Sequence, residues 1–165
     1  MKLMELFDRL WSLPRSITGE GVRETLRILN EMVPIKQLEY PTGLKCFDWT
    51  IPKEWNIRDA YVKNRQGERI IDFQKNNLHI LNYSIPIHQW VTRSELIEHI
   101  YTLPSLPHAI PYTTSYYQER WGFCLEHNRL AELRDAEYEV MIDASLEEGH
   151  LTLGEGYLPG ENPQE

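Results

Sequence analysis

The sequence has little of several features that define whole classes of protein, beginning with cysteine. Its 165 residues include two cysteines, Cys46 and Cys124, and these lack the CxxC spacing of zinc and redox motifs. The pattern predicts reduced thiols in a cytoplasmic protein, although it leaves a single disulfide open. The apolar surroundings of Cys124 should raise the pKa of its thiol and keep it unreactive.

Long apolar runs and an excess of positive charge are also missing. No apolar run approaches the roughly 20 residues that a membrane-spanning helix needs, so we expect no membrane partner. Met1-Lys2 leads directly to charged residues rather than to an uncharged segment, so we expect no secretion signal. Acidic residues outnumber basic ones by 25 to 17, and no basic stripe is present, so nucleic acid is not an expected partner.

Histidine spacing suitable for a metal is absent as well. No two of the six histidines stand in HxH or HxxxH spacing, whereas a zinc site needs three or four convergent ligands. Single aspartates near the strands form no acid–base pair, and no serine lies in a nucleophile elbow. The sequence therefore predicts no catalytic residue, no metal ligand and no cofactor within this chain.

The N-terminal part of the sequence predicts two helices. Apolar residues at helical spacing predict an amphipathic helix over 2–12, ended by Pro14, and a second helix over 21–32. Ser16 and Thr18 are the candidate caps of the second helix.

After Pro34 the apolar spacing changes to the period of two that is typical of strands. We predict that 35–40 pairs with 46–51 across the turn at 41–43, and that 57–63 and 69–73 form a hairpin. A strand at 78–83 and a helix over 92–100 capped by Thr92 follow.

The last third adds a short helix at 128–134 and strands at 138–144 and 151–158, joined as a hairpin. Glu137, Glu139, Met141 and Asp143 should place one face of the first of these strands in water. The predicted fold class is α+β, with two N-terminal helices followed by a mainly antiparallel β domain that contains short inserted helices.

The stretch from Ala109 to Leu125 carries the densest group of aromatic side chains. Such a group either packs a turn or lines a concave site, and the sequence leaves both open. We expect a mixture in which Trp121 and Phe123 are buried anchors and tyrosines lie at a site. The candidate substrate-binding residues are Tyr112, Thr114, Tyr116, Tyr117 and Trp121.

Four segments carry a resemblance to a known family over most of the chain. They read RSITGEGVRETLRIL, PTGLKCFDWTIPKEWNIRDAYV, IIDFQKNNLHILNYSIPIH and IPYTTSYYQERWGFC. They resemble bacterial aminopeptidase-like proteins, in which a β domain of unknown function interrupts a zinc-peptidase domain, often with a winged helix after it. Members often lie near polysaccharide-biosynthesis genes.

The resemblance implies a division of the chain and a function. Residues 1–34 would belong to the peptidase lobe, 35–135 to the inserted β domain, and 136–165 to a β hairpin that leads back to that lobe. The family's zinc ligands would lie beyond Glu165, so this chain would shape the cleft of a hydrolase that acts on peptide or aminoacyl substrates. Alone it should be inactive, free of zinc and prone to self-association through its helices. The alternative is a stand-alone module that binds a sugar, a nucleotide sugar or a protein.

Overall fold

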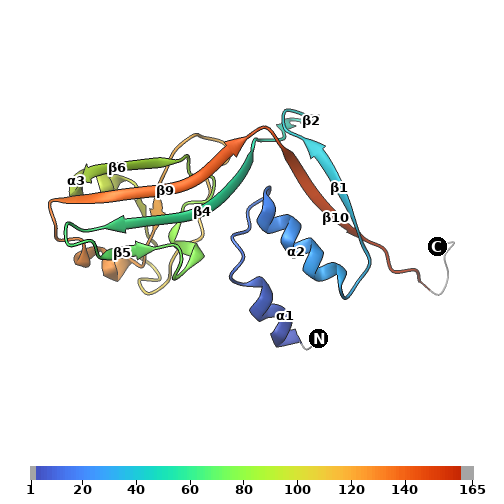
Figure 1. Cartoon of the computed structure of the whole chain (residues 1–165), viewed down its shortest axis with the longest axis horizontal. Helices are drawn as coiled ribbons and strands as arrows, with labels where there is room; N and C mark the ends of the chain where they lie inside the picture. The colour runs from blue at the N-terminus through green and yellow to red at the C-terminus, as the bar shows by residue number, and fades with distance from the viewer. Residues whose placement is uncertain (1–2, 161–165) are drawn as a thin grey trace. The chain divides into compact units, whose positions relative to one another are not determined.

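The computed structural model describes residues 3–160 and has the predicted α+β fold (Figure 1). The chain forms two compact units. The first takes the residues up to Glu54 together with those from Glu147 onward, and the second takes Trp55–Leu146. No helix among the described residues has the length and apolar character needed to cross a membrane.

The first unit contains both predicted N-terminal helices, α1 (Leu3–Leu10) and α2 (Glu20–Asn30). The predicted caps Ser16 and Thr18 are wrong, because Gly19 occupies the N-cap position and no side chain there caps the helix. Gly19 has φ 96°, a backbone conformation that glycine adopts without strain, so the chain turns into the helix without a capping side chain.

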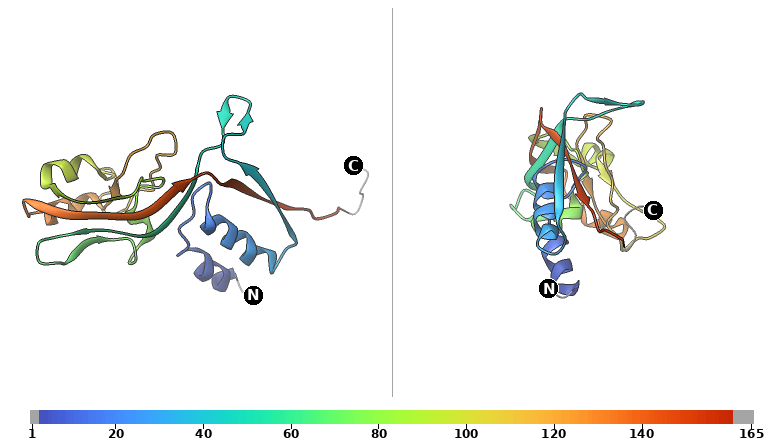
Figure 2. Two further views of the ribbon diagram at one scale, coloured as in Figure 1. Left: turned by 45° about the horizontal axis from the view of Figure 1, so that its top comes forward. Right: turned by 90° about the vertical axis from the view of Figure 1, so that its right-hand side faces the viewer.

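The sheet of this unit is a two-stranded ribbon of distant segments. Strand β1 (Ile35–Pro41) pairs antiparallel with β10 (His150–Gly156), and not with 46–51 as predicted. The amide of Thr42 donates to the Gly149 carbonyl at 2.9 Å, which fixes this pairing. The residues after it instead form a small hairpin of β2 (Lys45–Cys46) and β3 (Trp49–Thr50), seen in Figure 2.

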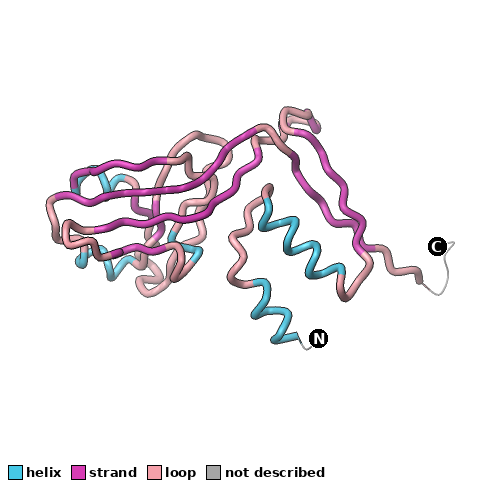
Figure 3. Tube along the Cα trace, in the orientation of Figure 1, coloured by secondary structure: helices cyan, strands magenta, loops and turns pink. Residues whose placement is uncertain are grey.

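The second unit is built on a four-stranded sheet of order β5-β4-β9-β6, whose strands are labelled in Figure 1 and drawn in magenta in Figure 3. Its strands are β4 (Glu54–Lys63), β5 (Arg69–Asp72), β6 (Ile87–Thr92) and β9 (Glu137–Glu147). The predicted hairpin of β4 and β5 is confirmed, with Gly67 at φ 84° in its loop. The predicted hairpin of the last two strands is wrong, because β9 has its partners in this sheet while β10 pairs with β1.

One face of this sheet holds the core and the other faces water, as the alternation in β9 predicts. Tyr138, Val140 and Ile142 are buried, whereas Glu139 and Asp143, which alternate with them along the strand, are partly exposed. Helix α3 (Arg93–Glu98) follows β6, and the Thr92 hydroxyl accepts from the Glu95 amide at 3.2 Å, as the capping box predicts.

Two predicted elements take another form. The segment 78–83 is no strand, since the Asn76 side chain accepts from the Leu78 amide and starts a 3-10 helix, η1 (Asn77–His79), followed by isolated bridges. The helix expected at 128–134 is a 3-10 helix, η2 (His127–Glu132). Between them lies a short parallel pair of β7 (Ile100–Tyr101) and β8 (Phe123–Cys124).

The buried His79 should make stability depend on pH. Burial lowers the pKa of His79 below 6.5, while its Nδ1 lies 2.9 Å from the Cys124 carbonyl. The unfolded chain therefore takes up this proton first as the pH falls. The contribution of His79 to stability is fully present above pH 6.5 and is lost as the pH falls below that value. We expect urea unfolding to show a steeper loss between pH 7 and 5 for the wild type than for His79→Gln. Equal slopes in the two proteins would contradict this, because the other five histidines are common to both.

Candidate functional site

The aromatic stretch is held in place by the backbone of a neighbouring loop. Ser115 is buried, its amide donates to the Asn82 carbonyl at 2.9 Å, and its hydroxyl lies within 3.2 Å of the carbonyls of Asn82 and Tyr83. The amide of Ile85 donates to the Arg120 carbonyl at 3.1 Å. These bonds fix both ends of the turn that carries Tyr116 and Tyr117.

A continuous series of rings runs from the core to this turn. Buried Trp55 stacks on Tyr83 with ring centroids 5.7 Å apart, Tyr83 meets the edge of Tyr116 at 5.8 Å, and Tyr116 contacts Tyr117 at 4.4 Å. Tyr83 has φ 66°, which is uncommon for a bulky side chain and costs of order 1 kcal/mol. The surrounding contacts hold this conformation, and it places Tyr83 between the other rings.

The predicted burial of Trp121 and Phe123 is confirmed, and two of the candidate tyrosines are exposed. Trp121 is 9% exposed and stacks on His99 at 3.6 Å, and Phe123 is fully buried. Tyr117 is 75% exposed and Tyr112 is 62% exposed. Of the five candidate residues, Trp121 is therefore nearly buried, whereas Tyr112 and Tyr117 are mostly exposed.

Two polar atoms at the base of the turn lack a hydrogen-bond partner within the described part of the chain. They are the Thr114 hydroxyl and Nε of Arg120, and both atoms are buried. The Arg120 guanidinium makes a long bond of 3.5 Å to the Thr114 carbonyl and lies 5.5 Å from the centre of the Tyr101 ring. Buried polar groups are nearly always paired, and among the described residues these two atoms share the exception with the Ser16 hydroxyl.

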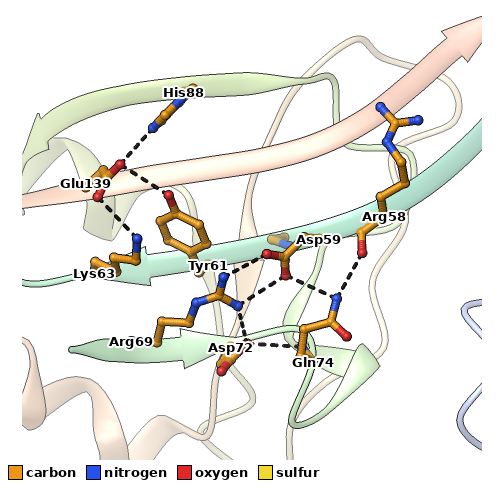
Figure 4. A network of polar contacts seen from close by, with 10 residues as sticks. Arg58, Asp59, Tyr61, Lys63, Arg69, Asp72, Gln74, His88 and Glu139 are labelled. Atoms are coloured by element: carbon orange, nitrogen blue, oxygen red, sulfur yellow. Dashed lines mark hydrogen bonds and ion pairs between the residues drawn. The ribbon is translucent and has the colours of Figure 1, made fainter. Parts of the chain in front are cut away.

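A second polar cluster lies on the water-facing side of the sheet, where the sequence predicted only a wet surface (Figure 4). Glu139 accepts from the Tyr61 hydroxyl at 3.2 Å, contacts His88 Nε2 at 2.7 Å and lies 3.7 Å from Lys63 Nζ. The His88 contact is the main reason that the pKa of Glu139 is lowered. Tyr61 is buried, and its ring contacts two cations, Lys63 at 4.0 Å and Arg69 at 4.4 Å from the ring centre.

The same face continues along β4 and β5 with paired charges. Arg69 binds Asp59 at 2.8 Å and Asp72 at 2.9 Å, and Gln74 donates to the Arg58 carbonyl at 2.9 Å (Figure 4). A shallow concavity of about 620 Å³ opens here, lined by Asp59, Tyr61, Pro86, Ile87, His88, Met141, Ile142 and Asp143. Only cross-strand register brings these residues together, so no sequence spacing could have revealed them. The charged and polar side chains of the cluster pair with one another, which makes the cluster a stabilising network.

The histidines do not gather around a common point. Within residues 3–160 no group of three or more His, Cys, Asp or Glu side chains is arranged to hold a metal ion. Five histidines bind instead to nearby protein groups: His79 to the Cys124 carbonyl, His88 to the Glu139 carboxylate, His99 to the Trp121 carbonyl, His108 to the Asn128 side chain and His127 to the Thr102 hydroxyl.

The two thiols should differ sharply in reactivity. Cys46 is exposed, whereas Cys124 is buried and burial raises its pKa to about 11, as its apolar setting predicts. Because the thiolate is the reactive form, Ellman's reagent at pH 8 should label one thiol per native chain and the second only after unfolding. A Cys46→Ser variant should show no labelling while native. Rapid labelling of that variant would mean that Cys124 is accessible.

These features define a mainly antiparallel β unit that is linked to a helical unit and presents an aromatic turn at its surface. The chain belongs to a family described as a domain of unknown function (DUF2172), which matches residues 54–145.

Two similar proteins extend this finding. One is a Clostridium acetobutylicum protein named "Putative polysaccharide biosynthesis protein with aminopeptidase-like domain", 50% identical over 164 residues. The match covers 99% of this chain and 38% of that protein, so the chain spans little more than a third of the relative's length. The other is a crystal structure described as a "putative peptidase" from the same organism, with a TM-score of 0.91 and 51% identity over 96% of this chain and 37% of that one. These two matches support the resemblance to proteins with an aminopeptidase-like domain.

Proposed function

We propose that this chain is the non-metal-binding part of a zinc aminopeptidase-like hydrolase and that it shapes the substrate cleft. The observation that carries the proposal is the similarity over nearly the whole chain to a protein about two and a half times as long that contains an aminopeptidase-like domain. The zinc, the catalytic residues and any winged helix would then belong to the rest of the longer polypeptide. The division at residues 34 and 135 and the cytoplasmic location are part of this proposal.

Exposed apolar side chains in the first unit support it. Leu3, Met4 and Phe7 of α1 are each more than half exposed, and so are Tyr157 and Leu158 after β10. Apolar surface of this kind is expected where another part of a protein packs. In the isolated chain the same surface would favour self-association.

Within this proposal, the aromatic stretch forms the wall of the cleft. Tyr112, Thr114, Tyr116 and Tyr117 would contact a peptide or aminoacyl substrate, with Trp121 supporting them. The metal would supply the activated water, and the residues of this chain would orient the substrate and exclude bulk solvent.

The alternative is a stand-alone binding module, and the exposed tyrosines above a rigid base favour it equally. The two functions differ in whether this chain binds its ligand without the rest of the longer polypeptide. A stand-alone module would keep its ligand affinity when separated from the longer protein, whereas a cleft wall would bind substrate only in its presence.

The test compares this chain with a polypeptide that corresponds to the full length of the relative. After dialysis, the long form should retain zinc and release aminoacyl groups in a reaction that a chelator stops. The 165-residue chain should do neither. Stoichiometric zinc in the short chain, together with hydrolysis that is lost on chelation, would overturn the proposal.

A further inference from the structure

Strand β6 forms one edge of the four-stranded sheet of the second unit (Figure 1). Its strand partner is β9, and no backbone hydrogen bond from a turn or loop of the described chain reaches Ile87–Thr92. Alternate residues of an edge strand direct their N–H and C=O groups away from the sheet, where another strand can pair with them. His88, Gln89 and Trp90 are exposed, so this edge is accessible.

The opposite edge, β5, has the protection that β6 lacks. It is four residues long, and Arg129 donates to the Ile70 carbonyl within it at 3.0 Å. It also carries Arg69 and Asp72, which pair with each other. Short length, charged side chains and a covering group all keep an edge strand from pairing. Strand β6 has six residues and no Lys, Arg, Asp or Glu among them, so it can accept a further strand.

A second copy of β6 complements this edge in an antiparallel register centred on Gln89. Ile87 then lies opposite Val91 of the other copy, on the face where their partners in β9 are buried. On the water-facing side, His88 lies opposite Trp90. Apolar and aromatic cross-strand pairs of this kind stabilise antiparallel sheets. The two Gln89 side chains meet at the centre, and each amide can both donate to and accept from the other.

The distribution of charge permits two copies to meet here, although the chain carries a net charge of −8. The acidic side chains of β9 beside β6 are already paired within the chain. Glu139 contacts Lys63 and His88, and Glu137 pairs with Arg65. Because paired opposite charges largely cancel at a distance, little repulsion opposes the approach of a second copy at this strand.

We propose that β6 pairs antiparallel with β6 of a second copy and joins two four-stranded sheets into one continuous sheet. One short strand from each copy makes a small interface, so we expect a dissociation constant of about 100 µM. This inference goes beyond the proposed function. It also concerns a surface other than the exposed apolar side chains of the first unit.

The experiment measures association of the 165-residue chain by sedimentation equilibrium and follows β6 by amide hydrogen exchange. With a dissociation constant of about 100 µM, about four-fifths of the chains are dimeric at about 1 mM and about one-sixth at about 10 µM. The outward-facing amides of β6 should therefore exchange about fourfold more slowly at the higher concentration. Amides of the β2–β3 hairpin should exchange at the same rate at both concentrations.

Three variants separate this edge from other routes of association. Gln89→Lys should weaken the dimer about tenfold, because two lysines then face each other and the paired amides are lost. Gln118→Lys makes the same substitution at an exposed residue in a turn of the same unit, and should dimerise like the wild type. Phe7→Lys removes an exposed ring of α1 and should leave the protection of β6 unchanged.

A wild type that stays monomeric at the higher concentration would overturn the proposal, and so would exchange in β6 that is independent of concentration. Association that Phe7→Lys abolishes and Gln89→Lys retains would assign it to the helices instead. Protection of β6 that appears only in the longer polypeptide, at every concentration, would assign the edge to the rest of that polypeptide. Either result contradicts the proposal.

If Gln89→Lys fails to fold, the exchange of the wild type at the two concentrations decides. The measurement uses no metal and no substrate, so its failure leaves the peptidase proposal unaffected. A failure of the peptidase assay likewise leaves this result standing.

Discussion

Replacing Trp55 with alanine is expected to lower the free energy of unfolding by about 3–5 kcal/mol, the range for large aromatic residues in a core. The side chain is 2% exposed and stacks on Tyr83, so its removal leaves a cavity beneath the ring series. Its indole N–H also donates to the Ser84 carbonyl at 2.9 Å, and that buried acceptor would lose its donor. Urea unfolding followed by circular dichroism measures the loss.

Two further variants separate these effects. Trp55→Phe keeps much of the ring volume but not the N–H, so it should cost about 1–3 kcal/mol. Trp90→Ala, at an exposed tryptophan of the same sheet, should change stability by less than about 1 kcal/mol. If Trp55→Ala and Trp90→Ala had equal effects, the ring series would not be anchored through Trp55.

Glu54→Ala is expected to lower the free energy of unfolding by about 2 kcal/mol. Glu54 pairs with Arg23 of α2, whose Nη1 lies 3.1 Å from its carboxylate, and it accepts from the His150 amide at 3.1 Å. The two side chains are only 13% and 21% exposed, so the change leaves a partly buried cation and a lost backbone contact. Amide exchange in β10 should become about 30-fold faster.

Glu20 provides the matched control, because it binds the same arginine from a side chain that is 76% exposed. Glu20→Ala should cost less than about 0.5 kcal/mol, as exposed ion pairs usually do. Gly149→Ala offers a cross-check, since its new Cβ would lie 2.5 Å from Oε2 of Glu54, an atom that Glu54→Ala removes. In the double variant with Glu54→Ala, the loss of stability should be smaller than the sum of the two single losses. Equal effects of the two glutamate changes would contradict the role given to burial.

Local patterns predicted the elements whose causes are local. The β4–β5 hairpin followed from Gly67 in its loop, and the Thr92 cap from its spacing to Glu95, because both depend on neighbours in the chain. The pairing of β1 with β10 could not be foreseen in this way. The turn at 41–43 suggested a local hairpin, whereas the actual partner comes from the far end of the chain.

The candidate site shows the same limit. Aromatic density singled out Tyr112, Tyr116 and Tyr117, and their mixed exposure with Trp121 was predictable because large rings serve both as anchors and as contacts. Arg120 was missed. Its unpaired guanidinium nitrogen becomes visible only once the Thr114–Arg120 turn is closed in three dimensions.

The separation of β1 from β10 has a consequence for the order in which the chain folds. Thr42 and Gly149, which bond beside this ribbon, are 107 positions apart. Closing a loop of that length in a flexible chain costs about 4 kcal/mol of entropy. Once the second unit has folded, its first and last residues lie on the neighbouring strands β4 and β9. Most of the entropy of closing the loop has then already been lost. The β1–β10 ribbon should therefore form last, after synthesis has passed β10, so damage to the second unit would slow the assembly of a sheet that contains none of its residues.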